Sequence, residues 1–357
     1  MNIIFRYISM SFIKLFVICN CSFLLVYLTI DFMGQFWKLS ARGIPLPEVS
    51  LYFTLKIPLI LSQITPMATL LSTLLTLGLL SRNSEITIMK SCGISIFYIS
   101  VPILALSLLI SVFSLGMNEY LLPHTNKKVK EIERYRPGRV SSKTFIKRNE
   151  IWYFGKSNIV NIDLLVMEEK QLRGVTILQL GKDKKVKRRI DAKKARWDSG
   201  KWLFSEGVIR HFENSLKVET FREKEIPLEE KFSDFTVVVR SSEEMTFREL
   251  KKHIEKLKHM GLDYNRYMVD LMAKIAFPLV NFILPLLGIP FALKTGRSAG
   301  IAAGVGISIV IGFSYWVTMA FNISLGHAAL LPPFFAAFGS NIIFTLAGII
   351  ALLNVKS

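Results

Sequence analysis

Four stretches of the chain carry no charged side chain over at least 19 consecutive residues, and they limit its possible folds more than any other feature. They are residues 57–81, 94–118, 275–293 and 298–355. An apolar run of about 18 or more residues is long enough to cross the hydrocarbon core of a bilayer as a helix. A soluble enzyme and a secreted domain are therefore excluded, and the sequence indicates a protein that crosses a membrane several times.

The number of crossings follows from these stretches and from a further apolar segment near the N-terminus. That segment, residues 15–37, is not followed by a signal-peptide cleavage pattern, so we expect a retained helix. Residues 298–355 are too many for one crossing, and Pro332 and Pro333 mark a break. The sequence predicts six transmembrane helices, at residues 15–37, 57–80, 94–117, 267–293, 298–321 and 331–354.

Charge is concentrated between the third and the fourth predicted helix. Residues 119–265 hold 33 of the 45 Lys and Arg residues and 23 of the 27 Asp and Glu residues. Such a segment belongs in water, so we predict a membrane part at 1–118, a polar domain at 119–265 and a second membrane part at 266–357. The net charge of +18 does not indicate nucleic acid as a partner, because the chain is too deeply embedded in membrane.

Most of the polar domain has the residue pattern of β-strands. Strand-like runs rich in β-branched and aromatic residues occur at residues 151–154, 175–180 and 237–239. Residues 195–204 predict a hairpin with an Asp-Ser-Gly turn. We expect an antiparallel sandwich or open roll, followed by a helix that begins with a capping box of Thr246 and Glu249 and ends at Gly261.

Basic residues in the short loops determine the orientation in the membrane. The side that holds both termini carries seven: Arg6, Lys14, Arg82, Lys90, Lys294, Arg297 and Lys356. The opposite side carries three: Lys38, Arg42 and Lys56. Cytoplasmic loops are enriched in Lys and Arg, so we predict that both termini are cytoplasmic and that the polar domain lies on the other face.

The sequence contains no motif for catalysis or for binding nucleotides or metals. Gly155-Lys156-Ser157 lacks the upstream glycine of a phosphate-binding loop, because residue 150 is Glu. Ser314 and His327 match no known pattern of an intramembrane hydrolase. We therefore predict a protein that is not an enzyme, with no catalytic or metal site and no cofactor of its own.

The loop at residues 82–93 is one candidate binding segment. Its period is helical, so Ile86, Met89 and Lys90 share a face, and Glu85 is available to a basic partner. An ordinary helix at the membrane surface is the alternative interpretation.

Three basic residues form the second candidate. Lys38, Arg42 and Lys56 bracket the outer ends of the first two predicted helices. They fit a cationic collar for a phosphorylated amphiphile, and they also fit side chains that extend to lipid headgroups without a specific ligand.

Taken together, these residues resemble the LptF/LptG family of lipopolysaccharide export permeases over nearly the whole chain, and the LptG branch is the closer one. The matching segments are Phe5-Arg-Tyr, Pro66-Met-Ala-Thr-Leu-Leu, residues 82–93, the basic loop 294–297 and Pro332-Pro333.

The resemblance implies a fold, a location and a set of partners. It implies six helices in the Gram-negative inner membrane, with a periplasmic β-jellyroll between helices three and four. The implied partners are a paralogous six-helix permease, a cytoplasmic ATPase dimer that binds the ATP, a single-helix accessory subunit, a periplasmic bridge protein and lipopolysaccharide as cargo.

The resemblance also assigns roles to the two candidate segments. Residues 82–93 become a helix that couples the chain to the ATPase, through Arg82, Ser84, Glu85, Ile86, Met89 and Gly93. Lys38, Arg42 and Lys56 become the cargo-binding residues. The alternative function is a mechanotransmission or signalling protein that transports nothing and binds a partner through its periplasmic domain.

Overall fold

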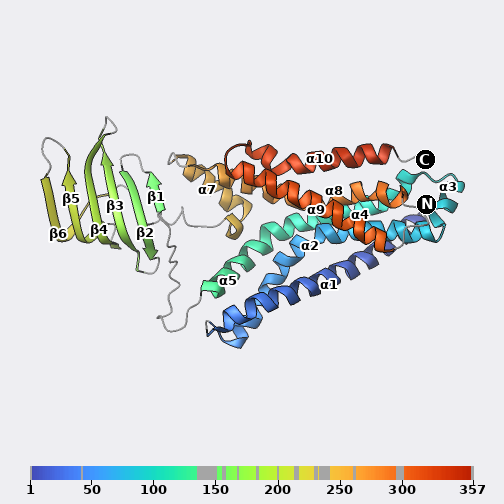
Figure 1. Ribbon diagram of the computed structural model, residues 1–357, viewed down its shortest axis with the longest axis horizontal. Helices are drawn as coiled ribbons and strands as arrows, with labels where there is room; N and C mark the ends of the chain where they lie inside the picture. The colour runs from blue at the N-terminus through green and yellow to red at the C-terminus, as the bar shows by residue number, and fades with distance from the viewer. Residues whose placement is uncertain are drawn as a thin grey trace. The chain divides into compact units, whose positions relative to one another are not determined.

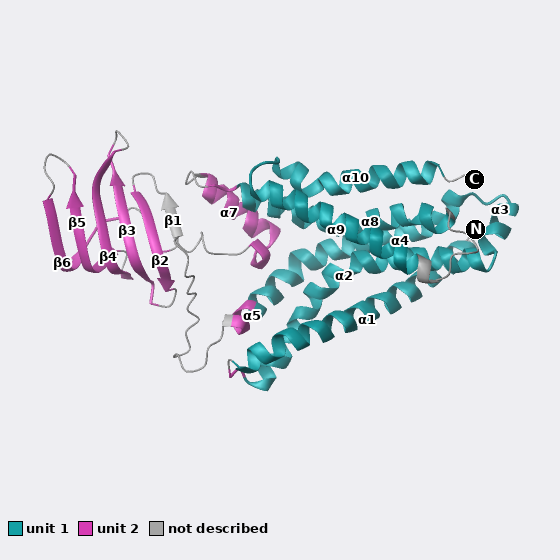
Figure 2. Ribbon diagram, viewed as in Figure 1, with its two compact units in different colours: residues 1–41, 45–129, 265–357 teal, residues 42–44, 130–264 magenta. Residues whose placement is uncertain are grey.

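The chain folds into two compact units. The computed structural model describes residues 2–354 apart from 42, 135–150, 155–157, 167–168, 182–184, 199–200, 213–216, 229–231, 233–241, 260–262 and 295–300. One unit contains residues 1–41, 45–129 and 265–357, and we call it the helical unit. The other contains residues 42–44 and 130–264, and we call it the β unit (Figure 2).

Among the described residues, six helices are long and apolar enough to cross a membrane, which confirms the predicted number. They are α1 (Asn2–Ala41), α2 (Leu46–Arg82), α4 (Ile96–Gly116), α8 (Asn265–Lys294), α9 (Ile301–His327) and α10 (Pro333–Leu353). A short helix, α3 (Glu85–Ser91), separates α2 from α4. Figure 1 shows α3 at the same end of the helical unit as the start of α1 and the end of α10.

The third membrane helix extends beyond its predicted end. α4 continues through a π-helical turn, Met117–Leu121, into α5 (Leu122–Arg134). In that turn, Asn118 accepts a hydrogen bond of 2.9 Å from the hydroxyl of Ser62 on α2. The prediction ended the helix where charge appeared, but a helix that leaves the bilayer keeps its internal hydrogen bonds in water.

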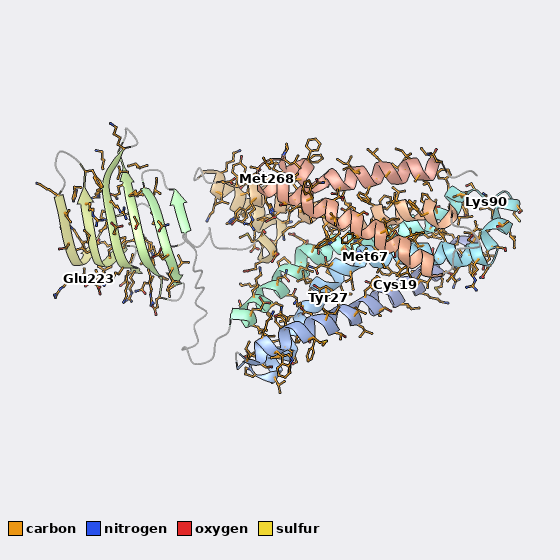
Figure 3. All side chains as sticks on the ribbon, in the orientation of Figure 1. Cys19, Tyr27, Met67, Lys90, Glu223 and Met268 are labelled. Atoms are coloured by element: carbon orange, nitrogen blue, oxygen red, sulfur yellow. The ribbon has the colours of Figure 1, made fainter. Side chains whose placement is uncertain are left out.

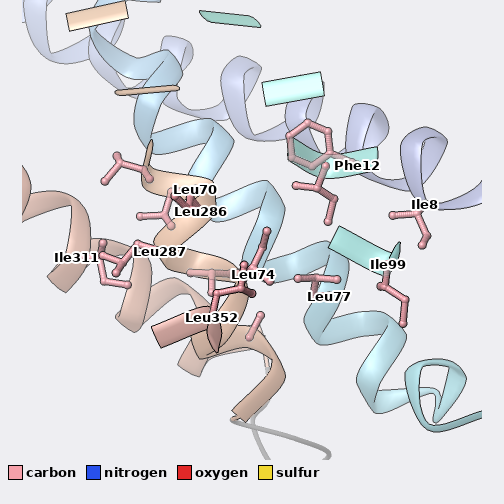
Figure 4. Close-up of a cluster of buried hydrophobic side chains, with 14 of the residues drawn as sticks. Ile8, Phe12, Leu70, Leu74, Leu77, Ile99, Leu286, Leu287, Ile311 and Leu352 are labelled. Atoms are coloured by element: carbon pink, nitrogen blue, oxygen red, sulfur yellow. The ribbon is translucent and has the colours of Figure 1, made fainter. Parts of the chain in front are cut away.

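α2 and α8 form the centre of the helical unit. In the most apolar window of each of these helices, 72% of the residues are buried, against 6% in α1 and 28% in α9. Leu70, Leu74 and Leu77 of α2 belong to the same buried cluster as Leu286 and Leu287 of α8 (Figure 4). The apolar faces of α1 and α9 are therefore left for lipid or for another protein.

A buried amide ties the last three membrane helices together. Asn341 on α10 donates a hydrogen bond of 2.8 Å to the carbonyl of Ala276 on α8. Its side-chain oxygen accepts a hydrogen bond from the hydroxyl of Tyr315 on α9. Because hydrocarbon offers no competing partner, such bonds fix how the helices pack.

The β unit contains an antiparallel sheet of six described strands in consecutive order. They are β1 (Ile151–Phe154), β2 (Asn158–Val166), β3 (Gln171–Leu180), β4 (Val186–Asp198), β5 (Lys201–His211) and β6 (Lys217–Glu225). The predicted β character of the inserted domain is confirmed. The described strands form a meander, in which every strand pairs with its neighbours in sequence, whereas a jelly roll also pairs strands far apart in sequence. The predicted strand at 237–239 lies outside the described residues.

Two local predictions in the β unit are confirmed. Trp197 and Trp202 are paired across the β4–β5 hairpin, and their ring centroids lie 5.0 Å apart. Ser199 and Gly200 of the predicted turn lie outside the described residues.

The capping box is present at the start of α7 (Phe247–His259). The amide of Glu249 donates to the Thr246 hydroxyl at 3.2 Å, and the amide of Thr246 donates to the Glu249 carboxylate at 3.0 Å. The predicted stop at Gly261 lies outside the described residues.

Asp191 on β4 is the centre of a polar network on the sheet. It accepts hydrogen bonds from Arg189 and from the Thr176 hydroxyl, the latter at 2.9 Å, and it forms an ion pair with Arg210. Partial burial raises the pKa of Asp191, but the hydrogen bonds and the two positive charges outweigh it and hold the pKa below its usual value.

We expect the substitution Asp191→Asn to lower the free energy of unfolding of the β unit by about 1–2 kcal/mol at neutral pH. The folded-state pKa of Asp191 is depressed, so its contribution is present above the unfolded pKa of about 4 and is lost as pH falls through the folded value. Hydrogen exchange of the β3–β5 amides in the full chain measures the loss. Glu206→Gln is the matched control, because its exposed pair with Lys193 contributes little; an equal effect of both substitutions would contradict the assignment.

Candidate functional site

α3 is bounded by two residues with left-handed backbone. Ser84 precedes it with φ of 63°, and Gly93 follows it with φ of +81°. Such values favour glycine, so a serine there shows that the surrounding packing imposes the turn. These two turns allow a helix of seven residues to fit between α2 and α4.

The two faces of α3 differ in what they contact. Ile86 is only 6% exposed and belongs to the bundle core with Ile8 of α1 and Ile99 of α4. Met89 packs against the same core, whereas Ile88 is 60% exposed.

The sequence predicted that Ile86, Met89 and Lys90 share one face of this helix and that Ile86 and Met89 belong to the coupling segment; that role stays a prediction. In the structure these two side chains anchor α3 to its own bundle. The exposed face includes Thr87, Ile88 and Lys90, and Lys90 is labelled in Figure 3. Periodicity finds a shared face but does not determine which protein that face meets.

Glu85, at the start of α3, is connected to α1. It accepts a hydrogen bond of 3.1 Å from the side-chain amide of Asn83, and it interacts with Tyr7 of α1. A carboxylate has further acceptor sites, so these contacts orient Glu85 and leave it able to meet a basic group. Arg82, exposed at the end of α2, precedes Ser84 and Glu85 in the same segment. The sequence-based prediction did not include Tyr7, because no local sequence pattern connects α1 with α3.

The three collar residues have different surroundings. Lys38 is exposed in the last turn of α1, and Arg42 lies outside the described residues. Lys56 on α2 forms an ion pair with Asp31 of α1, with its Nζ 2.7 and 2.8 Å from the two carboxylate oxygens. In the structure, the charge of Lys56 is neutralised by Asp31, and the sequence-based prediction did not include this acid. The available signal was an acidic residue inside an apolar segment, which is costly in a membrane unless it is paired.

The fold and these sites define a class: a helical membrane protein whose six spans are divided three and three by an inserted antiparallel β unit. The family model described as "Lipopolysaccharide export system permease LptF/LptG" matches residues 6–354, and the chain belongs to this family.

Two similar proteins are both LptG permeases, in agreement with the predicted LptG branch. The chain is 22% identical to lipopolysaccharide export system permease protein LptG of Escherichia coli K12 over 330 residues, which cover 87% of this chain and 89% of the relative. It is 24% identical to the LptG protein of Haemophilus influenzae over 324 residues, which cover 87% and 86% of the two chains.

Because one face of α3 is buried and the other is exposed, we expect different effects from substituting Ile86 and Ile88. Ile86→Ala removes a buried side chain, which typically costs about 2–5 kcal/mol, so α3 should detach locally from the bundle. Ile88→Ala should leave the isolated chain unchanged because that side chain is exposed. Hydrogen exchange of the α3 amides in the purified chain distinguishes the two; equal protection in both variants would contradict the assignment.

Proposed function

We propose that this chain is the permease subunit of an ATP-driven transporter that extracts lipopolysaccharide from the inner membrane and passes it to a periplasmic bridge toward the outer membrane. The observation that carries the proposal is the family match over residues 6–354, which includes both sets of membrane helices and the β unit. The LptG relatives are named as permeases of lipopolysaccharide export. The chain itself carries no nucleotide motif, so a separate ATPase supplies the energy.

The proposed assembly follows the expectations from the sequence. A paralogous six-helix permease covers the exposed apolar faces of α1 and α9. A cytoplasmic ATPase dimer docks at α3, and a single-helix accessory subunit and a periplasmic bridge protein complete the path. Both termini and α3 are cytoplasmic, and the β unit is periplasmic.

Within this proposal, α3 acts as the coupling helix. The exposed face of α3 contacts a groove on the ATPase through one apolar side chain, Ile88, and two polar side chains, Thr87 and Lys90. Glu85 meets a basic residue of the ATPase while Asn83 and Tyr7 hold its orientation. Arg82, Ser84 and Gly93 set the position of the helix, and Ile86 and Met89 transmit its movement to the bundle core.

A test of the whole proposal begins with purification from the native membrane. We expect an ATPase and a second six-helix protein to copurify, and we expect lipopolysaccharide to stimulate ATP hydrolysis in the reconstituted complex. Transfer of lipopolysaccharide out of the vesicles to a periplasmic acceptor distinguishes transport from signalling. A complex that hydrolyses ATP and transfers no glycolipid would favour the mechanotransmission function instead.

The predicted orientation can be checked with cysteine chemistry. Glu223 is exposed on β6, and Cys92 is an exposed native cysteine next to α3 (Glu223 is labelled in Figure 3). In spheroplasts, a membrane-impermeant maleimide should label Glu223→Cys at once and Cys92 only after permeabilisation. The reverse order would overturn the orientation.

We expect Glu85→Ala and Ile88→Asp to reduce copurification of the ATPase, each while leaving the chain folded. Removing one partner of a buried charged pair at an interface typically costs about 2–5 kcal/mol, which corresponds to at least a tenfold loss of binding. The amount of ATPase retained per permease is the measurement. Lys38→Ala, at the other end of α1, is the control; wild-type retention in both α3 variants would reject the coupling role.

Cargo contact is tested by photocrosslinking. A photoreactive residue at position 38, 42 or 56 should crosslink to lipopolysaccharide more strongly than one at position 90, on the cytoplasmic side. Equal labelling at all four positions in an assembled complex would show that the three basic residues only anchor headgroups.

A further inference from the structure

The ion pair between Asp31 and Lys56 joins the outer parts of α1 and α2. The Lys56 ammonium lies 2.7 and 2.8 Å from the two oxygens of Asp31, and the two side chains are 14% and 13% exposed. Asp31 lies ten residues before the end of α1, and Lys56 lies ten residues after the start of α2. At 1.5 Å per residue, the pair lies about 15 Å along the helices from the turn that connects them.

Aromatic side chains surround this pair. The hydroxyl of Tyr52, a residue with no exposed surface, lies 3.2 Å from the Lys56 ammonium, and its ring centroid lies 5.3 Å away. Phe32, next to Asp31, packs against Phe53 of α2 with the two rings tilted and their centroids 5.1 Å apart. The charges therefore lie in a low-dielectric setting, where their attraction is strong and the loss of either partner is costly.

The pair adds a charged contact to a helix that is packed at its start, where Ile8 and Phe12 are fully buried, and largely exposed further along. Only 6% of the residues in its most apolar window are buried. Two neutral hydrogen bonds also connect it to α2, from Thr65 to Asn20 at 3.5 Å and from Tyr27 to Gln63 at 3.3 Å (Tyr27 is labelled in Figure 3). Both are longer than the ion pair and neither involves a charge, so each contributes less.

We propose that the Asp31–Lys56 pair is a latch between α1 and α2 that a phosphate of the glycolipid headgroup opens by replacing Asp31 at Lys56. The inference rests on the proposed function and adds a regulatory role for Asp31. Lys56 at this depth requires an anion, so a neutral lipid cannot release it from Asp31. A phosphate carries about 1.5–2 negative charges and three acceptor oxygens, so it competes with a single carboxylate.

The exchange has a structural consequence. When phosphate replaces Asp31 at Lys56, Asp31 loses its partner, and the neutral bonds and aromatic contacts that remain between α1 and α2 are too weak to keep the outer half of α1 in place. α1 then separates from α2 at this end, next to the bound headgroup. Loading of cargo and movement of α1 are therefore one event, and unphosphorylated lipids leave the latch closed.

The experiment measures the separation of the two helices directly. Met33 on α1 and Leu51 on α2 are 71% and 49% exposed, so both accept spin labels after replacement by cysteine in a chain whose three native cysteines have been removed. The labelled permease is assembled with its partners in lipid nanodiscs, and distances are measured by pulsed electron paramagnetic resonance. The three additions are bisphosphorylated lipid A, the same lipid A after phosphatase treatment, and inorganic phosphate.

We expect a single short distance without ligand and a second, longer population with bisphosphorylated lipid A. Dephosphorylated lipid A and inorganic phosphate should change nothing. If dephosphorylated lipid A increases the distance, apolar contacts drive the movement. If inorganic phosphate increases the distance, the site responds to any free anion and not to the lipid headgroup. Either result overturns the latch.

Variants test the role of the pair itself. Asp31→Asn should raise the ratio of long to short distances at least tenfold without ligand, and the charge exchange Asp31→Lys with Lys56→Asp should restore the short distance. Tyr27→Phe, which removes a neutral bond between the same helices, is the matched control and should stay closed. If Asp31→Asn behaves like Tyr27→Phe, or if the exchanged pair stays open, the pair is not a latch.

ATP hydrolysis in the same samples separates the two proposals. Stimulation by bisphosphorylated lipid A with an unchanged distance refutes the latch and leaves the proposed function standing. Neither stimulation nor a change in distance refutes both.

Discussion

The absence of water in the hydrocarbon core of a membrane is the constraint on which this structure depends. Every backbone N–H and C=O group that enters the core needs a partner within the protein, and a helix provides one for each. Helices and closed β-barrels both meet this requirement, and the length of the uncharged segments is that of helices. The same constraint governs side chains: Asn341 is buried with partners on two neighbouring helices, and Asp31 and Lys56 neutralise each other.

The helices that result differ in how much protein surrounds them. α2 and α8 are central, while α1 and α9 keep most of their apolar surface exposed. Apolar surface toward lipid costs nothing, so exposure alone does not destabilise these helices. Besides the buried side chains Ile8 and Phe12, α1 makes polar contacts with neighbouring helices at two places along its length. Near the start of α1, Tyr7 interacts with Glu85, the first residue of α3, and toward the other end Asp31 pairs with Lys56.

These two contacts place α1 between the proposed ATPase site and the proposed cargo site. α3 is attached to the bundle through Ile86, which shares a buried cluster with Ile8 and Phe12 of α1. Under the proposed function, a displacement of α3 by the ATPase reaches α1 through this apolar contact, and a bound headgroup acts on the same helix through Lys56. Both contacts lie on one continuous helix of 40 residues, about 60 Å long, which links the two sites.

The sequence by itself determined the six membrane helices, the inserted β unit and the position of α3. Each depends on a local property: the length of an uncharged run, alternation of residue types, or a capping pair such as Thr246 and Glu249. The hairpin of Trp197 and Trp202 followed for the same reason, because a turn and its flanking strands are neighbours in sequence.

Only the tertiary structure decided which face of α3 is exposed, where the third helix ends, and what Lys56 contacts. Ile86 and Ile88 are both apolar and two residues apart. Ile86 packs against α1 and α4, whereas Ile88 is exposed, and the sequence does not distinguish the two. Lys56 and Asp31 are 25 residues apart on different helices, so their pairing depends on how α1 and α2 pack. Local patterns specify elements because backbone and solvent act on each segment separately, whereas a site requires contacts between segments, which only packing creates.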